Sequence, residues 1–471
     1  MASTGVKTYT SDLAAFAHDM KLADVPAEAR HEALRILIDC LGCGVAGLVA
    51  PGTRIAIDLV KDERGPLQAN VISVGPVSLA PAVYANAGAI NSLDFDVYGP
   101  EAHLSPVVVA AALAAGDAVD ASGADVFAAM AAGLEVGGRI GAALRRVGSG
   151  GRSGTGEMEA TRGQGNLVFG AAVAAGRLLG LTGDQMHHAL GIAGYSATVP
   201  TMTKFLASRN LPMTKYDHLA LAAQNGVQAA LLAMRGFTGD LEVLEGEEIG
   251  FWRFAGAPGC DWDAFTGGLG DHWVLPEVTY KYYPAVLYTN SIIYEAERLV
   301  REHGLKPDEI DRIEVRSART RAGATRPHPR HYLEAWGNSA YTISCGVLGV
   351  RPLRSWEEPK TFDRPDIGAM MKKIELKPLR EGEVTSTGQQ WERWAPTRVT
   401  IEARGQTFEG GRDYHVSMDD AALVAKFHDN VGGLLTDEAA HDLERAAWGL
   451  EGLPRIGELT TILAGADPSR A

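Results

Sequence analysis

The stretch AVYANAGAINSLDFDVYGPEAHLSPVVVAAALAA, residues 82–115, decides the fold that we expect. It contains two runs of small apolar residues, Ala82–Ile90 and Val107–Ala115, which are typical of closely packed buried helices. A short polar break between the runs holds three carboxylates and one imidazole, from Asp94, Asp96, Glu101 and His103. The pattern is compatible with two structures. One is a pair of buried helices whose junction places titratable groups in a pocket, and the other is a solvated connection with Asp96 or Ser92 as a helix cap.

The composition of the chain is that of a globular enzyme with two domains. Its 471 residues exceed what one hydrophobic core usually organises. Its 55 glycines are well above the average share of about 7%, and small residues allow helices to approach closely. The net charge of −14 argues against a nucleic-acid partner, and the absence of a basic cluster argues against an anionic membrane surface.

The termini and cysteines predict a cytoplasmic protein without a membrane span. The N-terminal sequence MASTGVKTYTSDLAAF lacks a charged region followed by an apolar core. The longest uninterrupted apolar runs fall short of the roughly 20 residues that cross a bilayer. Cys40 and Cys43 form a CxxC inside an apolar helix, without a second pair or a histidine cluster. We therefore expect packed core thiols rather than a redox or zinc site.

Hydrophobic periodicity predicts a mainly α fold. Apolar stripes at helical spacing dominate the first 250 residues, which we expect to be almost wholly helical. After about Gly270, two runs with alternating β-branched residues predict strands, at Asp311–Ala318 and Thr397–Arg404. Helical patterns separate them, and Arg351–Asp366 resembles a long surface loop. We expect an all-α domain over residues 1–270, an inserted α+β lid domain over residues 271–410, and C-terminal helices over residues 411–471 that return to the all-α domain.

Several further segments combine polar residues with small or aromatic neighbours. The glycine-rich stretch Gly148–Asn166 precedes a helix but lacks a nucleotide-binding signature, so it is a plain connection or a loop over a pocket. A second segment gathers positive charge before an alanine-rich helix, at Lys204, Arg209, Lys215 and His218. It is either a solvated basic connection or part of a site, and in helical geometry Lys215 and His218 share a face.

Two more residues complete the candidate pocket. Lys281 lies among four tyrosines, so it is an amphipathic surface group, a desolvated base or an anion anchor. Tyr341 opens an apolar helix, where a core tyrosine with a satisfied hydroxyl is the structural alternative. Together with Asp94, His103, Lys215 and His218, they predict a pocket whose cations bind a small carboxylate and stabilise the charge that develops when a proton leaves the adjacent carbon. No zinc, Rossmann or P-loop pattern is present, so chemistry without metal or cofactor is favoured.

At these same segments the chain resembles the MmgE/PrpD family over nearly its whole length. DCLGCGVAG (Asp39–Gly47) is similar to the family's DxLGxxxAG, and NSLDFDVYGPEAHLS is similar to its LDFDD…HPS stretch. The segment Thr214–Gly246 resembles the family's TKRLHAGRAAQSG…RGFTGP…LEG, and KYYPAVLYTN resembles its KPYPCCRYTH. The resemblance implies an all-α domain built from both chain ends, a smaller α+β lid, a homodimer, and a cofactor-independent lyase or isomerase such as a 2-methylcitrate dehydratase, cis-aconitate decarboxylase or iminodisuccinate epimerase.

The resemblance also assigns site residues. It implies active-site positions at Asp94, His103, Lys215, Lys281 and Tyr341, with His218 matching the histidine of the basic helix. We take Lys281, Tyr341, His103 and Asp94 as the candidate catalytic residues. The candidate substrate-binding residues are Lys215, His218, Lys204 and Arg209. We expect Asp96 and Glu101 to be structural or at the rim.

Departures from the family pattern keep the reaction open. The family's His-Pro is His103-Leu104 here, the closing histidine of the lid motif is Asn290, and another expected histidine falls near Thr161. Val97 and Tyr98 replace the threonine that a dehydratase would have near the second aspartate. Elimination and epimerisation at a carbon next to a carboxylate both remain possible. The alternative is a catalytically lapsed member that binds a carboxylate ligand or serves as an interaction subunit.

Overall fold

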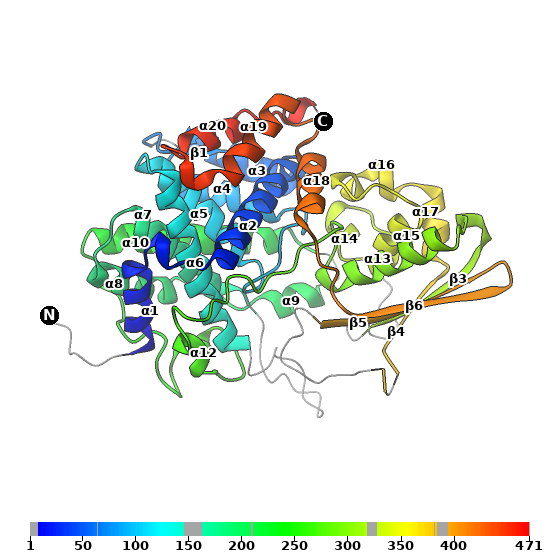
Figure 1. Ribbon diagram of the computed structural model, residues 1–471, viewed down its shortest axis with the longest axis horizontal. Helices are drawn as coiled ribbons and strands as arrows, with labels where there is room; N and C mark the ends of the chain where they lie inside the picture. The colour runs from blue at the N-terminus through cyan, green and yellow to red at the C-terminus, as the bar shows by residue number, and fades with distance from the viewer. Residues whose placement is uncertain are drawn as a thin grey trace. The chain divides into compact units, whose positions relative to one another are not determined.

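The computed structural model describes residues 8–63, 65–145, 163–208, 211–317, 327–380, 382–383 and 394–470 (Figure 1). The chain divides into two compact units. The helical unit comprises the described residues of Met1–Ser92, Asp96–Val278 and Leu423–Ala471, and the mixed unit comprises those of Leu93–Phe95 and Thr279–Ala422. The mainly α fold class is confirmed.

The helical unit contains most of the α-helices. They are α1 (Tyr9–Asp19), α2 (Ala27–Ala46), α3 (Pro51–Asp62), α4 (Leu79–Asn91), α5 (Leu104–Ala118), α6 (Gly123–Arg145), α7 (Val168–Leu178), α8 (Gly183–Tyr195), α9 (Met202–Ala207), α10 (Thr214–Met234), α11 (Phe251–Phe254), α12 (Asp263–Thr266), α18 (Asp420–Val431, in this unit from Leu423), α19 (Asp437–Trp448) and α20 (Gly457–Ala464).

Small residues allow the central helices of this unit to pack closely. Helices α4, α5, α6, α7 and α10 contact one another in its core. A Cβ on Gly133 of α6 would lie 2.7 Å from the carbonyl oxygen of Gly170 on α7, so neither position has room for a larger residue. The same helices carry the apolar stripes that predict them, and Thr182 caps α8 by accepting a hydrogen bond from the Gln185 backbone N–H.

Helix α6 is apolar along most of its length. Over Gly123–Leu144 it is long and apolar enough to cross a membrane, but 94% of its most apolar 18-residue window is buried inside the protein, as in the core helix of a globular protein. Its two buried charges pair with each other: Arg139 Nε lies 2.6 Å from Glu135 Oε1. Glu135 also accepts hydrogen bonds from the Val274 and Leu275 backbone N–H groups. The ion pair and these hydrogen bonds thus offset the free-energy cost of burying the two charges.

A short hairpin interrupts the helices of the N-terminal region. Strands β1 (Ala69–Val71) and β2 (Gly75–Val77) pair antiparallel. The expectation of an almost wholly helical first 250 residues was wrong at this point. Each strand has only three residues, too few for a period-two pattern to stand out in the sequence.

The mixed unit combines a four-stranded sheet with short helices. Its strands are β3 (Ile310–Ser317), β4 (Ile374–Lys377), β5 (Trp394–Ala403) and β6 (Gln406–Tyr414), in the order β4-β3-β5-β6. Strands β3 and β4 are parallel, whereas β3–β5 and β5–β6 are antiparallel. Its helices are α13 (Leu287–Glu302), α14 (Tyr332–Ala335), α15 (Ser339–Val347), α16 (Pro359–Phe362) and α17 (Pro365–Met371). Figure 1 shows α13 beside this sheet, and α13 contacts both β5 and β6.

The second core lies between these helices and the sheet. It includes Ile293, Val315, Trp356 and Ile401, each almost wholly buried. The expectation of a surface loop over Arg351–Asp366 was therefore wrong. This segment forms a 3-10 turn (Arg354–Glu357), helix α16 and the start of α17, and it buries Trp356 completely. The basic and proline-rich composition of this segment suggested exposure, although one large residue, Trp356, packs in the core.

Candidate active site

The candidate site is built on the junction between α4 and α5, which we call the α4–α5 loop (residues 92–103). Helix α4 ends at Asn91, and His103 is the residue that precedes α5. Asp94 and Ala102 adopt left-handed backbone conformations, with φ of 49° and 44°. Non-glycine residues rarely adopt this region, and surrounding structure must hold them there, often at functional sites. Gly99 also has positive φ, and a Cβ on it would lie 2.5 Å from the Glu277 carbonyl oxygen.

The polar side chains of this loop are buried. Asp94 is 3% exposed, Asp96 0%, Glu101 6% and His103 4%. The alternative of a solvated connection was therefore wrong. Asp96 and Glu101 were expected to be structural or at the rim, and their burial rules out a rim position but is compatible with a structural role. Four buried titratable groups in one short segment need specific partners, because a buried charge without one is costly.

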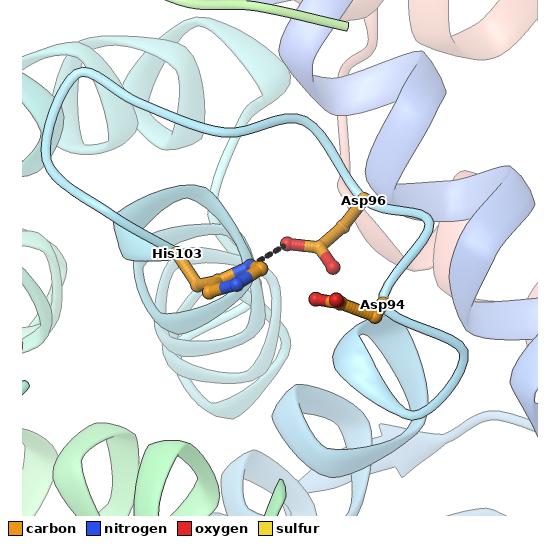
Figure 2. A group of neighbouring side chains, drawn as sticks. All are labelled: Asp94, Asp96 and His103. Atoms are coloured by element: carbon orange, nitrogen blue, oxygen red, sulfur yellow. Dashed lines mark hydrogen bonds and ion pairs between the residues drawn. The ribbon is translucent and has the colours of Figure 1, made fainter. Parts of the chain in front are cut away.

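In the helical unit, Asp96 and His103 form a hydrogen-bonded pair. His103 Nδ1 lies 2.7 Å from Asp96 Oδ2, and Figure 2 shows the ring and the carboxylate facing each other across this contact. The Asn91 side-chain amide donates to the other oxygen of Asp96, at 2.8 Å. The Tyr98 ring meets the imidazole edge-on, with the two ring centroids 5.3 Å apart. Such contacts fix the orientation of an imidazole.

A second buried pair of the helical unit supports the same loop. The Val97 backbone N–H donates to Asp39 Oδ2 at 2.7 Å, and Lys426 Nζ lies 2.7 Å from Asp39 Oδ1. Burial raises the pKa of Asp39, and the charge of Lys426 opposes this shift only in part. Burial acts to lower the pKa of Lys426, but the charge and hydrogen bond of Asp39, together with Cys43 and Asp96, outweigh it and the net direction is upward. The pair thus ties α2 and α18 to the residue next to Asp96.

In the mixed unit, Lys281 pairs with Asp94. Lys281 is 1% exposed, and its Nζ donates to the Asp94 backbone oxygen at 2.6 Å and to Asp94 Oδ1 at 3.1 Å. Of the alternatives that the sequence left open for Lys281, a surface position is wrong. A desolvated lysine held by a carboxylate is suited to anchoring an anion or moving a proton.

The α4–α5 loop also contains residue types that ligate metals. One ligand atom each from Asp94, Asp96 and His103 lies within 4.8 Å of the others, and all three residues appear in Figure 2. Hydrogen bonds and an ion pair already use His103 Nδ1, the Asp96 carboxylate and Asp94 Oδ1. We assign no metal to this group, because contacts with protein groups already use these ligand atoms.

The predicted basic residues near α10 have different environments. Lys215 is buried in the first turn of α10, whereas Lys204 on α9 is exposed. The His218 ring contacts two hydroxyls, with Nε2 2.7 Å from Thr198 Oγ1 and Nδ1 3.4 Å from Thr201 Oγ1. Arg209, Thr161 and most of the glycine-rich stretch lie outside the described residues.

Tyr341 and Asn290 belong to the core of the mixed unit. Tyr341 is fully buried, and its hydroxyl donates to the Trp356 carbonyl oxygen at 2.5 Å. Burial raises the pKa of this phenol well above its usual range, so the hydroxyl keeps its proton. Asn290 is the position at which the resemblance led us to expect the closing histidine of the lid motif. Its side chain accepts from the Tyr283 N–H and donates toward the Ala285 carbonyl oxygen, so it organises the backbone that follows Lys281.

The sequence alone did not identify Asn91, Asp39 or Lys426 as partners of this region, nor the pairing of Asp96 with His103. The DxD spacing of Asp94 and Asp96, with a histidine seven residues after the second aspartate, was the available sequence signal for the Asp96–His103 pair. No comparable signal connects Lys426 to Asp39, because 387 residues separate them.

Comparison with known proteins gives a consistent result over nearly the whole chain. Residues 11–259 match the model of the MmgE/PrpD N-terminal domain, and residues 283–451 match that of the MmgE/PrpD C-terminal domain. A cis-aconitate decarboxylase from Homo sapiens is 28% identical over 492 residues, covering 98% of this chain and 96% of that protein. Those from Mus musculus and Aspergillus terreus are 26% and 24% identical, covering 98% of this chain and 94% and 96% of their own lengths.

Proposed function

The chain belongs to the MmgE/PrpD family, and we propose that it is a lyase acting on a small di- or tricarboxylate. The observation that carries the proposal is the extent of the similarity to cis-aconitate decarboxylases, which spans 98% of this chain and nearly all of each relative. A shared fold alone would not support a shared reaction class. Here the buried polar residues of the α4–α5 loop and Lys281 add groups capable of the chemistry.

The proposed chemistry is proton transfer at a carbon near a carboxylate. In a decarboxylation, the bond to the departing CO2 breaks and leaves its electron pair on the carbon skeleton, which a proton then takes up. In a dehydration, a base takes a proton from one carbon, the C–H electron pair forms the double bond, and the hydroxyl of the neighbouring carbon leaves as water after an acid protonates it. Both reactions need a group that exchanges a proton with carbon, and both gain from cations that bind carboxylates.

We assign the proton exchange to His103 because its ring orientation is fixed by Asp96 and imidazole titrates near neutral pH. Lys281, held by Asp94, and Lys215 are the proposed cationic groups. Tyr341 is left out of the proposed proton transfer, because its buried hydroxyl donates to the Trp356 carbonyl oxygen and burial raises its pKa, which makes it a weaker acid. This chemistry uses only side chains of the chain itself.

The test is turnover by the purified chain. We expect cis-aconitate to release CO2, or a hydroxy-tricarboxylate such as 2-methylcitrate to yield an alkene that absorbs ultraviolet light, and dialysis against a chelator to leave the rate unchanged. Exchange and inversion at carbon in heavy water, without CO2 or alkene, would make the chain an isomerase instead. Stabilisation by polycarboxylates without any turnover would make it a catalytically lapsed binding protein.

A pair of histidine variants tests the site assignment. His103→Gln should reduce kcat by about 10²–10⁴-fold, the usual contribution of a positioned acid or base. His428→Gln is the matched control, since His428 also contacts a carboxylate, with Nε2 2.8 Å from Glu444 Oε2 in the helical unit. It should leave kcat unchanged. Equal activity in the two variants would remove His103 from the proposed mechanism.

A further inference from the structure

The hydrogen bonds of Asp96 restrict where the His103 ring can carry its proton. An ionised carboxylate only accepts hydrogen bonds, and Asp96 has both oxygens engaged: Oδ1 with Asn91 Nδ2 at 2.8 Å and Oδ2 with His103 Nδ1 at 2.7 Å. The contact with the imidazole is therefore a hydrogen bond only when Nδ1 holds a proton. In a neutral imidazole, that proton makes Nε2 the accepting nitrogen.

The opposite tautomer is disfavoured by the same geometry. Asn91 Nδ2 also lies 3.0 Å from His103 Nδ1 and could donate to a deprotonated Nδ1. In that arrangement, however, the Nδ1 lone pair would face the Asp96 carboxylate oxygen at 2.7 Å. A hydrogen bond to an ionised group is roughly twice as strong as a neutral one, so the bond to Asp96 prevails.

A backbone hydrogen bond next to Asp96 also helps to fix its position. The next residue, Val97, is tied by its backbone N–H to Asp39, which is paired with Lys426. Asp96 also interacts electrostatically with this pair, because its charge contributes to raising the pKa of both Asp39 and Lys426. Within the helical unit, the groups that contact the imidazole include Asp96, Asn91 and Tyr98, and the Asp39–Lys426 pair lies beyond Val97.

We propose that Asp96 is a positioning residue that keeps the His103 ring protonated at Nδ1, so that Nε2 is the nitrogen that exchanges a proton with the substrate. The inference rests on the proposed function in one respect, the role of His103 in proton transfer. The tautomer itself is a property of the resting protein and can be measured without any substrate.

The direct test is 15N NMR of the histidine-labelled chain near neutral pH, with His103 assigned by the signal that His103→Gln removes. We expect a protonated Nδ1 and an unprotonated Nε2 in the unmodified protein. The opposite tautomer there would overturn the proposal, whatever the chain catalyses. This measurement needs no variant at Asp96 to fold.

Asp96→Asn tests the same point by reversing the hydrogen bond. Asn91 donates to the Oδ1 side, so the new amide should turn its oxygen to Asn91 and its NH2 group to His103. That NH2 group would donate to Nδ1 and force the proton to Nε2. We expect the tautomer to switch and kcat to fall by about 10²–10⁴-fold with a smaller change in KM. The limb of the pH–rate profile due to imidazole should move to lower pH, because a carboxylate no longer stabilises the imidazolium.

Asp117→Asn is the matched control in the same unit. Asp117 accepts hydrogen bonds from Asn70 and Thr460, at 2.9 Å and 2.6 Å, rather than from an imidazole. This variant should leave the His103 signals, kcat and the pH–rate profile unchanged. An unchanged tautomer and unchanged kcat in Asp96→Asn would overturn the positioning role. A switched tautomer with full activity would instead remove His103 from the proposed reaction.

Discussion

Lys281 and Asp94 illustrate how much a single buried pair can contribute. Both side chains are almost fully removed from solvent, at 1% and 4% exposure. Lys281→Met would leave the Asp94 carboxylate buried without its cation. We expect the free energy of unfolding to fall by about 3–5 kcal/mol, the usual cost of breaking a buried pair from one side. Urea denaturation of the purified variant would measure it.

Lys377 provides the matched control for that substitution. It lies in the same unit and pairs with Glu314 at 2.6 Å, but 37% of its side chain is exposed. Lys377→Met should lower the free energy of unfolding far less than Lys281→Met, because solvent screens an exposed pair. The double variant Asp94→Asn/Lys281→Met should recover part of the loss, since it removes both charges. Equal costs for Lys281→Met and Lys377→Met would contradict the account of Lys281.

At the residue scale, the sequence indicated that the α4–α5 loop gathers titratable groups, but not how their side chains pair. His103 and Asp94 were identified because acids and imidazole interrupt an apolar pattern. Asp96 was expected to be structural or at the rim, because alternation along a loop does not reveal which side chain becomes buried. That choice depends on Asn91, and on Asp39 through Val97, and these contacts form only once the helices have packed.

The edge of the mixed sheet offers a prediction about elements. Arg312 on β3 makes a two-point contact with Glu375 on β4, at 3.0 and 2.7 Å. Hydrogen bonding from Arg312, then from Lys377, lowers the pKa of Glu375 from 4.5 to about 2. A lowered folded-state pKa contributes stability that is complete above pH 4.5 and disappears as the pH falls toward 2. Glu375→Gln should therefore lower Tm by roughly 1–2 °C at pH 7, and this difference should shrink below pH 4.5.

Thermal unfolding from pH 7 to pH 3 would measure that difference. Glu409→Gln is a suitable control, because Glu409 is an exposed carboxylate on β6 for which the described part of the chain provides no ion pair. Its Tm difference from the unmodified chain should not depend on pH over this range. A constant Glu375→Gln difference down to pH 3 would show that the Arg312 contact does not stabilise the ionised carboxylate.

Element prediction succeeded where a pattern was long enough and failed where it was short or mixed. Strands β3 and β5 were predicted from alternating β-branched residues, and their observed ranges differ from the predictions by one to three residues. Strand β4 has four residues and followed a segment taken for a loop. Strand β6 carries Gly410 and Gly411 in its middle, which weakens any strand pattern. Tertiary pairing with β5 fixes β6 despite that composition.

At the scale of the whole molecule, each compact unit draws on distant parts of the chain. The helical unit includes residues from near both ends, and the three residues Leu93–Phe95 belong to the mixed unit although both flanking segments belong to the helical unit. The α4–α5 loop therefore supplies Asp94 to one unit and Asp96 and His103 to the other. A sequence pattern cannot predict such a division, because it follows from long-range packing.

The four cysteines are distributed over both units, so their reactivity tests the burial of thiols in the whole molecule. All are free thiols; three are buried and Cys260 is half-buried. Burial raises the pKa of Cys260 and of Cys345 to about 12, and burial with the nearby Asp39 and Asp96 charges raises that of Cys40 well above 9. At pH 8, a thiol-specific disulfide reagent should thus react slowly with the native chain, chiefly at Cys260. In denaturant, with no reductant added, the same reagent should modify all four thiols. Cys260→Ser should remove most of the native reaction. Fewer than four thiols in denaturant, or fast native reaction of Cys40 or Cys43, would restore a redox role for the CxxC pair.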